Sequence, residues 1–221
     1  MGWQWFYRLG SPRWFYEKTD AWVPWLALLS IVLLLAGAVW GLGFAPQDSK
    51  QGNSYRIIYI HVPASFLALA GYYTMAISGA IGLIWKMKLA DMVMKCAAPI
   101  GAVLTFIALV TGAIWGKPTW GTWWVWDARI TSMLLLLFLY LGVIALQEAF
   151  QHQQTANKAS AILALVGTVN IPIIYKSVDW WYTLHQPATL QFTGESPIDS
   201  SMLYPLLTMI VGFYVFFALV L

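Results

Sequence analysis

Residues 97–115 read AAPIGAVLTFIALVTGAIW, and no side chain in this stretch is charged. As a helix, the stretch is long enough to cross the roughly 30 Å hydrocarbon core of a bilayer. Five more stretches have the same apolar character, and these are Trp22–Phe44, Ile57–Trp85, Ile130–Gln147, Ala159–Tyr175 and Met202–Leu221. The sequence therefore predicts an all-α integral membrane protein with six transmembrane helices, forming a single membrane domain over residues 1–221.

The composition agrees with a chain whose solvent is largely lipid. Of the 221 residues, 60% are hydrophobic and 10% are charged, whereas soluble domains carry about 25% charged residues. The net charge of +3 is small and its positive residues are scattered, so nothing in the sequence supports nucleic-acid binding. The single cysteine, Cys96, cannot form a disulfide within the chain, and there is no C-x-x-C-H motif for covalent haem attachment.

The distribution of lysine and arginine predicts the orientation. In the loops on the side of the N-terminus there are seven of these residues, and five are on the other side. Positive residues are enriched in cytoplasmic loops, so both termini are predicted to be cytoplasmic. The connections near 86–96 and 148–158 are then cytoplasmic, and the loops at about 116–129 and 176–201 are extracytoplasmic. The fifth apolar stretch contains Asn170 and Pro172, so we expect its end to be broken.

The first of the two outer loops is unusually rich in tryptophan. It contains the run Trp120-Gly-Thr-Trp-Trp-Val-Trp-Asp127, and five of the 14 tryptophans lie within twelve residues. Indole rings are large and flat, and each has one N–H donor. The cluster therefore predicts a platform for a large, flat, apolar ligand at the bilayer surface, and its members are Trp115, Trp120, Trp123, Trp124 and Trp126.

Two histidines are predicted on the same outer side. His61 and His185 both occur in the pattern H-x-P-A-[ST]. Histidine is a usual axial ligand of haem iron, so paired imidazoles are candidate metal ligands on the two faces of a porphyrin. The alternative for each ring is a hydrogen bond to a neighbouring residue. Pro63 either kinks a helix that runs through it or lies harmlessly in a first turn, and the sequence leaves both possibilities open.

Two arginines near the outer boundary are candidate partners for haem propionates. Arg56 precedes His61 by five residues and Arg129 follows Asp127 by two. A guanidinium group matches a carboxylate in bidentate geometry. The alternative for Arg56 is anchoring at the membrane interface. Arg129 can instead pair with Asp127, and this pair is the structural role we favour for Asp127, because an unpaired carboxylate among indoles is costly to desolvate.

The run from Trp120 to Asp127 resembles the WWD signature, W-G-x-x-W-x-W-D, of membrane proteins that handle haem. With six predicted helices, His61 in H-V-P, and His185, the whole chain is similar to the CcmC family of cytochrome c maturation. This resemblance implies that haem b is held at the periplasmic face of the bacterial inner membrane by His61 and His185. It also implies presentation of haem to the chaperone CcmE, with CcmD and the ABC-type pair CcmA and CcmB as further partners.

The resemblance implies a carrier rather than an enzyme acting by itself, because the covalent chemistry takes place on the chaperone. One alternative is a membrane subunit that itself translocates haem, but the apolar stretches offer few polar residues at mid-membrane depth, mainly Ser78, Thr105 and Asn170. Another alternative is a b-type cytochrome that transfers electrons. Because loops reorganise more easily than helices, we expect His185 to be the ligand displaced during hand-over.

Overall fold

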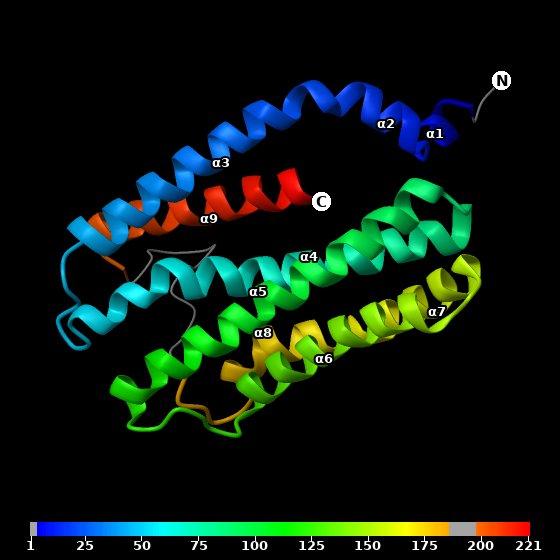
Figure 1. The fold of residues 1–221 in the computed structure, drawn as a ribbon. Helices are drawn as coiled ribbons and strands as arrows, with labels where there is room; N and C mark the ends of the chain where they lie inside the picture. Colours follow the sequence, from blue (N-terminus) through cyan, green and yellow to red (C-terminus); the bar gives the residue numbers. More distant parts are fainter. Residues whose placement is uncertain (1–3, 186–197) are drawn as a thin grey trace.

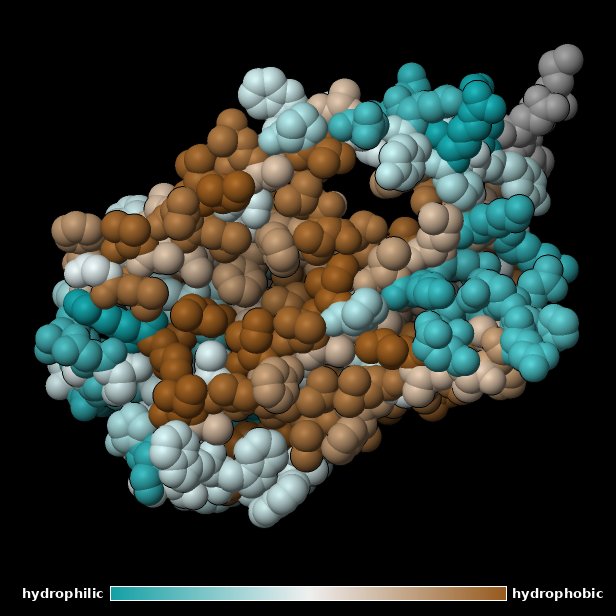
Figure 2. All heavy atoms as spheres, in the orientation of Figure 1, coloured by the Kyte–Doolittle hydropathy of each residue, from teal (hydrophilic) through white to brown (hydrophobic). Residues whose placement is uncertain are grey.

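The computed structural model describes residues 4–185 and 198–221, and all regular secondary structure in this part of the chain is helical. Six helical stretches in it are long and apolar enough to cross a membrane. Figure 2 shows the corresponding apolar belt between two more polar ends. The predicted fold class, an all-α membrane protein with six spans, is confirmed. The six stretches are Pro12–Phe44, Asn53–Trp85, Lys88–Trp120, Ala128–Ala149, Gln153–Trp180 and Ser200–Val220.

Several of these stretches are built from more than one element. The first joins α2 (Pro12–Thr19), a short 3-10 turn, α3 (Val23–Ala38) and a π-helical turn (Val39–Phe44). A 3-10 turn over Asn53–Ile57 precedes α4. The remaining elements are α1 (Gln4–Leu9), α4 (Ile58–Trp85), α5 (Lys88–Trp120), α6 (Ala128–Ala149), α7 (Gln153–Gly167), α8 (Asn170–Trp180) and α9 (Ser200–Val220). Helices α4 to α8 pack together, while α3 pairs with α9, which also contacts α4 (Figure 1).

The helices extend beyond the apolar stretches that predicted them. Helix α5 begins at Lys88, so the predicted cytoplasmic loop 86–96 is wrong and only Lys86 and Met87 separate α4 from α5. The turn is this tight because Lys86 adopts a left-handed conformation, with φ of 53°, at the end of α4. Hydrophobicity marks where a helix meets lipid, whereas the backbone hydrogen bonds continue into the polar boundary.

The outer loops are shorter than predicted for the same reason. Helix α5 continues to Trp120, where Gly121 takes a left-handed φ of 78°, and α6 begins at Ala128. The loop is therefore 121–127 instead of 116–129, and Trp115 and Trp120 lie on a helix. Helix α8 reaches Trp180, so residues 176–180 are also helical. Part of the predicted loop 176–201, including Pro187, lies outside the described residues.

Both proline-related expectations have a structural outcome. The fifth span is broken, but at Thr168 and Val169, between α7 and α8, which is near its middle and not at the end where the break was expected. The buried amide of Asn170 donates to the Ser132 carbonyl of α6 over 2.9 Å at this break. Helix α4 runs through Pro63, which is its sixth residue, so the first-turn alternative is wrong.

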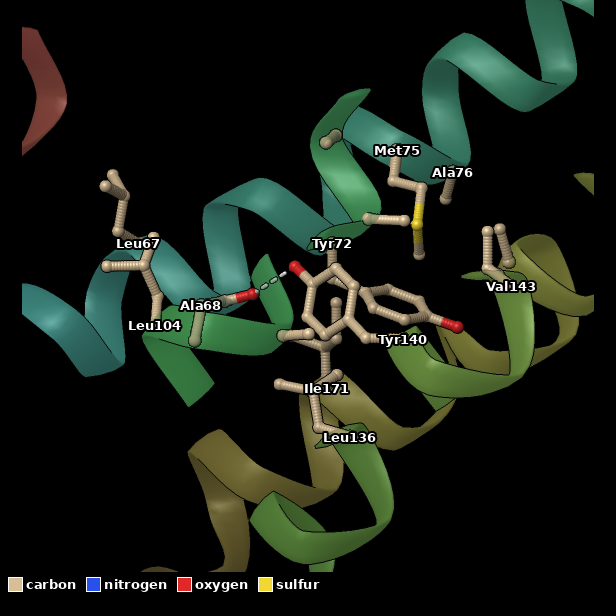
Figure 3. Packing of buried hydrophobic residues seen from close by; sticks show 14 of the residues in the cluster. Leu67, Ala68, Tyr72, Met75, Ala76, Leu104, Leu136, Tyr140, Val143 and Ile171 are labelled. Atoms are coloured by element: carbon tan, nitrogen blue, oxygen red, sulfur yellow. Dashed lines mark hydrogen bonds between the residues drawn. The ribbon is translucent and has the colours of Figure 1, made fainter. Parts of the chain in front are cut away.

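The larger buried cluster lies among α4, α5, α6, α7 and α8 (Figure 3). At its centre the rings of Tyr72 and Tyr140 meet edge to face, with centroids 5.1 Å apart. The Tyr140 hydroxyl donates to the Ala68 carbonyl over 2.7 Å and so links α6 to α4. A smaller cluster, which includes Tyr59 and Leu206, joins the start of α4 to α9. The start of α4, where His61 lies, is therefore packed on both sides.

The loops with the unusual chemistry lie at one end of the helix bundle. Residues 45–52, 121–127 and 181–185 are at the left of Figure 1, and the tight α4–α5 and α6–α7 connections are at the right, the end nearer the N-terminus. The membrane side that each end faces stays a prediction.

Candidate functional site

His61 lies in the first turn of α4 and contacts α5. Its Nδ1 atom is 3.0 Å from the Thr111 hydroxyl oxygen. That hydroxyl has a single hydrogen, which it donates to the Ile107 carbonyl over 2.6 Å. Thr111 can therefore only accept a hydrogen bond from His61. On this ground we assign the imidazole proton to Nδ1, which leaves the lone pair on Nε2.

Two more residues of α5 hold the His61 ring in place. Trp115 meets it edge to face with a centroid separation of 5.7 Å, and the Trp115 indole N–H donates to the Gln51 side chain over 2.6 Å. Gly112 lies directly against the imidazole, because a Cβ there would be 3.1 Å from His61 Cε1. Sequence reasoning missed Thr111, Gly112 and Gln51. The only available signal for Thr111 was its helical spacing from Trp115, four residues away on one face, and it was not used.

His185 follows α8 and is held by the loop before α6. Its Nδ1 atom is 3.1 Å from Asp127 Oδ2, and its ring meets Trp120 with centroids 4.8 Å apart. The Thr183 hydroxyl also bonds to the Asp127 carboxylate and accepts the backbone N–H of His185 over 3.1 Å. Two segments that are 58 residues apart are therefore joined at one carboxylate.

Asp127 has a different structural role from the predicted one. Its carboxylate accepts the Ile130 backbone N–H over 2.8 Å as the N-cap of α6 and also accepts bonds from Thr183 and His185. The expected ion pair with Arg129 is not formed as a direct contact among the described residues, and Asp127 acts on Arg129 only through a longer-range electrostatic interaction. One carboxylate oxygen, Oδ1, caps α6, and the other, Oδ2, is left to bond His185.

The electrostatics favour a neutral imidazole beside a charged carboxylate. Burial raises the pKa of Asp127, but hydrogen bonds from Ile130, Thr183 and His185 outweigh this and hold it below its usual value. Burial lowers the pKa of His185, although Asp127 acts in the opposite direction. Neutral His185 thus donates from Nδ1 to the carboxylate, and its Nε2 keeps a lone pair.

The two imidazoles and Arg129 share one electrostatic neighbourhood. His61 interacts with both His185 and Arg129, and His185 interacts with Arg129. Arg129 lies in the first turn of α6 and is partly exposed. Among the described residues, no hydrogen bond or ion pair engages its guanidinium group. Arg129 also interacts with the carboxylates of Asp127 and Asp179. Its charge acts on both imidazoles, and a guanidinium group that no described residue engages suits a metal-bound ligand with carboxylates.

The guanidinium group of Arg56, unlike that of Arg129, is engaged in hydrogen bonds within the described part of the protein. Its two terminal nitrogens donate to the carbonyls of Leu42 and Ala45, over 2.9 and 2.8 Å, at the end of the π-helical turn. Its Nε atom is buried and has no partner among the described residues. Arg56 therefore ties the chain after α3 to the start of α4. Its assignment as a propionate partner stays a prediction.

The other tryptophans of the motif differ in exposure. Trp123 and Trp126 are 57% and 75% exposed. Trp124 is partly buried and packs edge to face on Trp126 with centroids 5.4 Å apart. Trp115 and Trp120 contact the histidines, so the motif separates into two indoles beside the imidazoles and two that face outward.

Comparison with known proteins points to one family. The model of the family described as heme exporter protein C matches residues 5–221. Heme exporter protein C of Escherichia coli (strain K12) is 54% identical over 211 residues, covering 96% of this chain and 85% of the relative. The protein of the same name from Haemophilus influenzae is 48% identical over 211 residues, covering 96% and 86%. That from Rhodobacter capsulatus is 40% identical over 208 residues, covering 94% and 86%.

Proposed function

Because this chain belongs to the heme exporter protein C family, we propose that it binds haem b at the periplasmic face of the bacterial inner membrane and delivers it to the haem chaperone CcmE in c-type cytochrome biogenesis. The observation that supports this most is that His61 and His185 have the same hydrogen-bonding arrangement. Each ring bonds an acceptor through Nδ1 and keeps Nε2 available, which is the state in which imidazole binds a metal.

In the proposed complex, His61 and His185 bind the iron from opposite faces of the porphyrin through Nε2. Trp115 and Trp120, which each contact one histidine, supply apolar surface beside the ring system. Arg129 pairs with a propionate, because its guanidinium group has free donors among the described residues and interacts with both histidines. Arg56 is the second candidate, through its buried and unpaired Nε.

The exposed part of the tryptophan motif is proposed as the docking surface for CcmE. Trp123 and Trp126 face outward at the end of the bundle where the histidines lie, and exposed indoles are frequent anchors of protein interfaces. A carrier must release its cargo, and a site at the end of the bundle lets a partner cover the open edge. CcmD, CcmA and CcmB are proposed as further partners, and the ABC-type subunits CcmA and CcmB are proposed to hydrolyse ATP. Membrane lipid is proposed to surround the six spans.

A subunit that itself translocates haem is less well supported. Such a path needs polar groups available at mid-membrane depth. The buried side chains of Thr105 and Asn170 instead bond carbonyls within the protein, Gly101 and Ser132 respectively. A b-type cytochrome is also less well supported, because His61 lies in the first turn of α4 and His185 follows α8. His61 packs between α4 and α5, but His185 lies in a segment outside the helices.

The absorption spectrum of the purified protein tests haem ligation. We expect a six-coordinate, low-spin haem spectrum, and we expect the double variant His61→Ala/His185→Ala to lose it while keeping its helical circular dichroism. A low-spin spectrum retained by the double variant would overturn the ligand assignment. Incubation with purified CcmE then tests delivery, since haem should move to the chaperone. Accumulation of haem inside sealed proteoliposomes that hold this protein alone would favour translocation instead.

Substituting the outward-facing indoles should separate docking from haem binding. We expect Trp123→Ala and Trp126→Ala to weaken CcmE binding while haem content stays near the parent level, because neither ring contacts a histidine. Trp120→Ala should reduce haem content too, since Trp120 packs on His185. Trp25→Ala is the matched control, being 70% exposed and at the start of α3, whereas the loop 45–52 follows the other end of that span. Binding measured by co-purification that falls equally in the control would contradict a specific docking role.

A further inference from the structure

We propose that Thr111 is a positioning residue for haem, because its hydroxyl accepts the Nδ1 proton of His61 and so makes Nε2 the nitrogen that binds iron. This inference rests on the proposed ligation of haem by His61. Thr111 does not touch the iron in this proposal and acts only through the imidazole.

The geometry around the hydroxyl decides the imidazole tautomer. Thr111 donates its only hydrogen to a carbonyl of its own helix, with Ile107 at 2.6 Å and Ala108 at 3.2 Å from its oxygen. A hydroxyl that donated to Nδ1 instead would leave the proton on Nε2, which then could not bind a metal. The Ala108 carbonyl also interacts with the His61 ring. Because both neighbours are acceptors, they select the same tautomer.

The surrounding packing holds the His61 imidazole ring in this orientation. Trp115 lies across one edge of the imidazole, and Gly112 lies so near Cε1 that a Cβ there would be 3.1 Å away, closer than most real Cβ contacts. A rotation that exchanged the two nitrogens would have to displace these contacts. The same arrangement recurs at His185, where the acceptor is the Asp127 carboxylate. Partners of this kind orient ligating histidines, and their loss commonly weakens metal affinity by about 10–100-fold.

Three substitutions on α5 test the role of Thr111. Thr111→Val keeps the shape but removes the acceptor, and Thr111→Ser keeps the acceptor. Thr105→Val is the matched control, because Thr105 is buried on the same helix and also donates to the carbonyl four residues earlier, over 2.7 Å, without contacting a histidine. Haem dissociation constants are measured by competition with apomyoglobin, and the ferric spectra and midpoint potentials of the haem complexes are recorded.

We expect Thr111→Val to weaken haem binding about 10–100-fold and to shift the low-spin spectrum and the midpoint potential. Thr111→Ser should restore the parent values, and Thr105→Val should not change them. Suppose that His61→Ala loses the low-spin signal but Thr111→Val keeps the parent haem affinity and spectrum. That result would overturn the role of Thr111 and leave the proposed haem ligation by His61 intact. If His61→Ala itself keeps that signal, ligation by His61 is wrong and the inference fails with it.

Discussion

His185→Ala is expected to lose haem more completely than His61→Ala, with a dissociation constant about 10-fold higher than that of the His61 variant. The reason is the difference between the two hydrogen-bond acceptors. His185 donates to the Asp127 carboxylate, whereas His61 donates to the neutral hydroxyl of Thr111. An anionic acceptor makes an imidazole a stronger electron donor to a metal, so we expect His185 to form the stronger bond to the proposed iron and His61 to be the ligand released first.

This expectation reverses the one drawn from the sequence, in which the loop histidine is the displaced ligand. His185 does follow α8 in a loop, but Asp127, Trp120 and Thr183 hold it. The measurement compares haem retained after purification, and haem transferred to CcmE, for the two single variants. Equal losses in both readouts would contradict unequal ligands. A larger loss in His61→Ala would restore the assignment of His185 as the displaced ligand.

Asp127→Asn is expected to weaken haem binding about 10–100-fold while the protein still folds. The asparagine oxygen can still cap α6 through the Ile130 N–H, which lies 2.8 Å from the present carboxylate. Its amide nitrogen, however, faces His185 as a donor. The imidazole then carries its proton on Nε2, and the nitrogen proposed to bind iron is blocked.

Asp199→Asn separates this effect from helix capping. Asp199 caps α9 through the Ser201 N–H over 2.8 Å and contacts neither His61 nor His185. Haem affinity should therefore stay at the parent value in this control, and thermal unfolding in detergent should show both variants folded. A loss of thermal stability in Asp127→Asn with unchanged haem affinity would mean that Asp127 serves only as a cap.

Much of the architecture was predictable because it depends on local properties of the chain. A run of apolar residues long enough to cross a bilayer has to form a helix, since lipid offers no partner for backbone N–H and C=O groups. All six predicted spans are present for this reason. Their ends were not predictable from hydrophobicity, because helical hydrogen bonding continues past the lipid boundary. Trp115 and Trp120 consequently lie on α5, where they contact the histidines.

The partners of the polar groups depended on contacts distant in sequence. Asp127 was expected to pair with Arg129, two residues away, but one carboxylate oxygen caps α6 and the other bonds His185, 58 residues away. Thr111 gave no chemical signal of its own, and only the packing of α4 on α5 brings it to His61. Such pairings follow from how the helices meet, which no local pattern contains.

The amino-acid sequence by itself determined the membrane class, the six spans and the tryptophan motif, because each is a property of contiguous residues. Only the tertiary structure decided which ring nitrogen of each imidazole carries the proton and which indoles remain exposed. Those properties depend on side chains that neighbouring helices bring within hydrogen-bonding distance, and the packing of the helices alone sets which side chains these are.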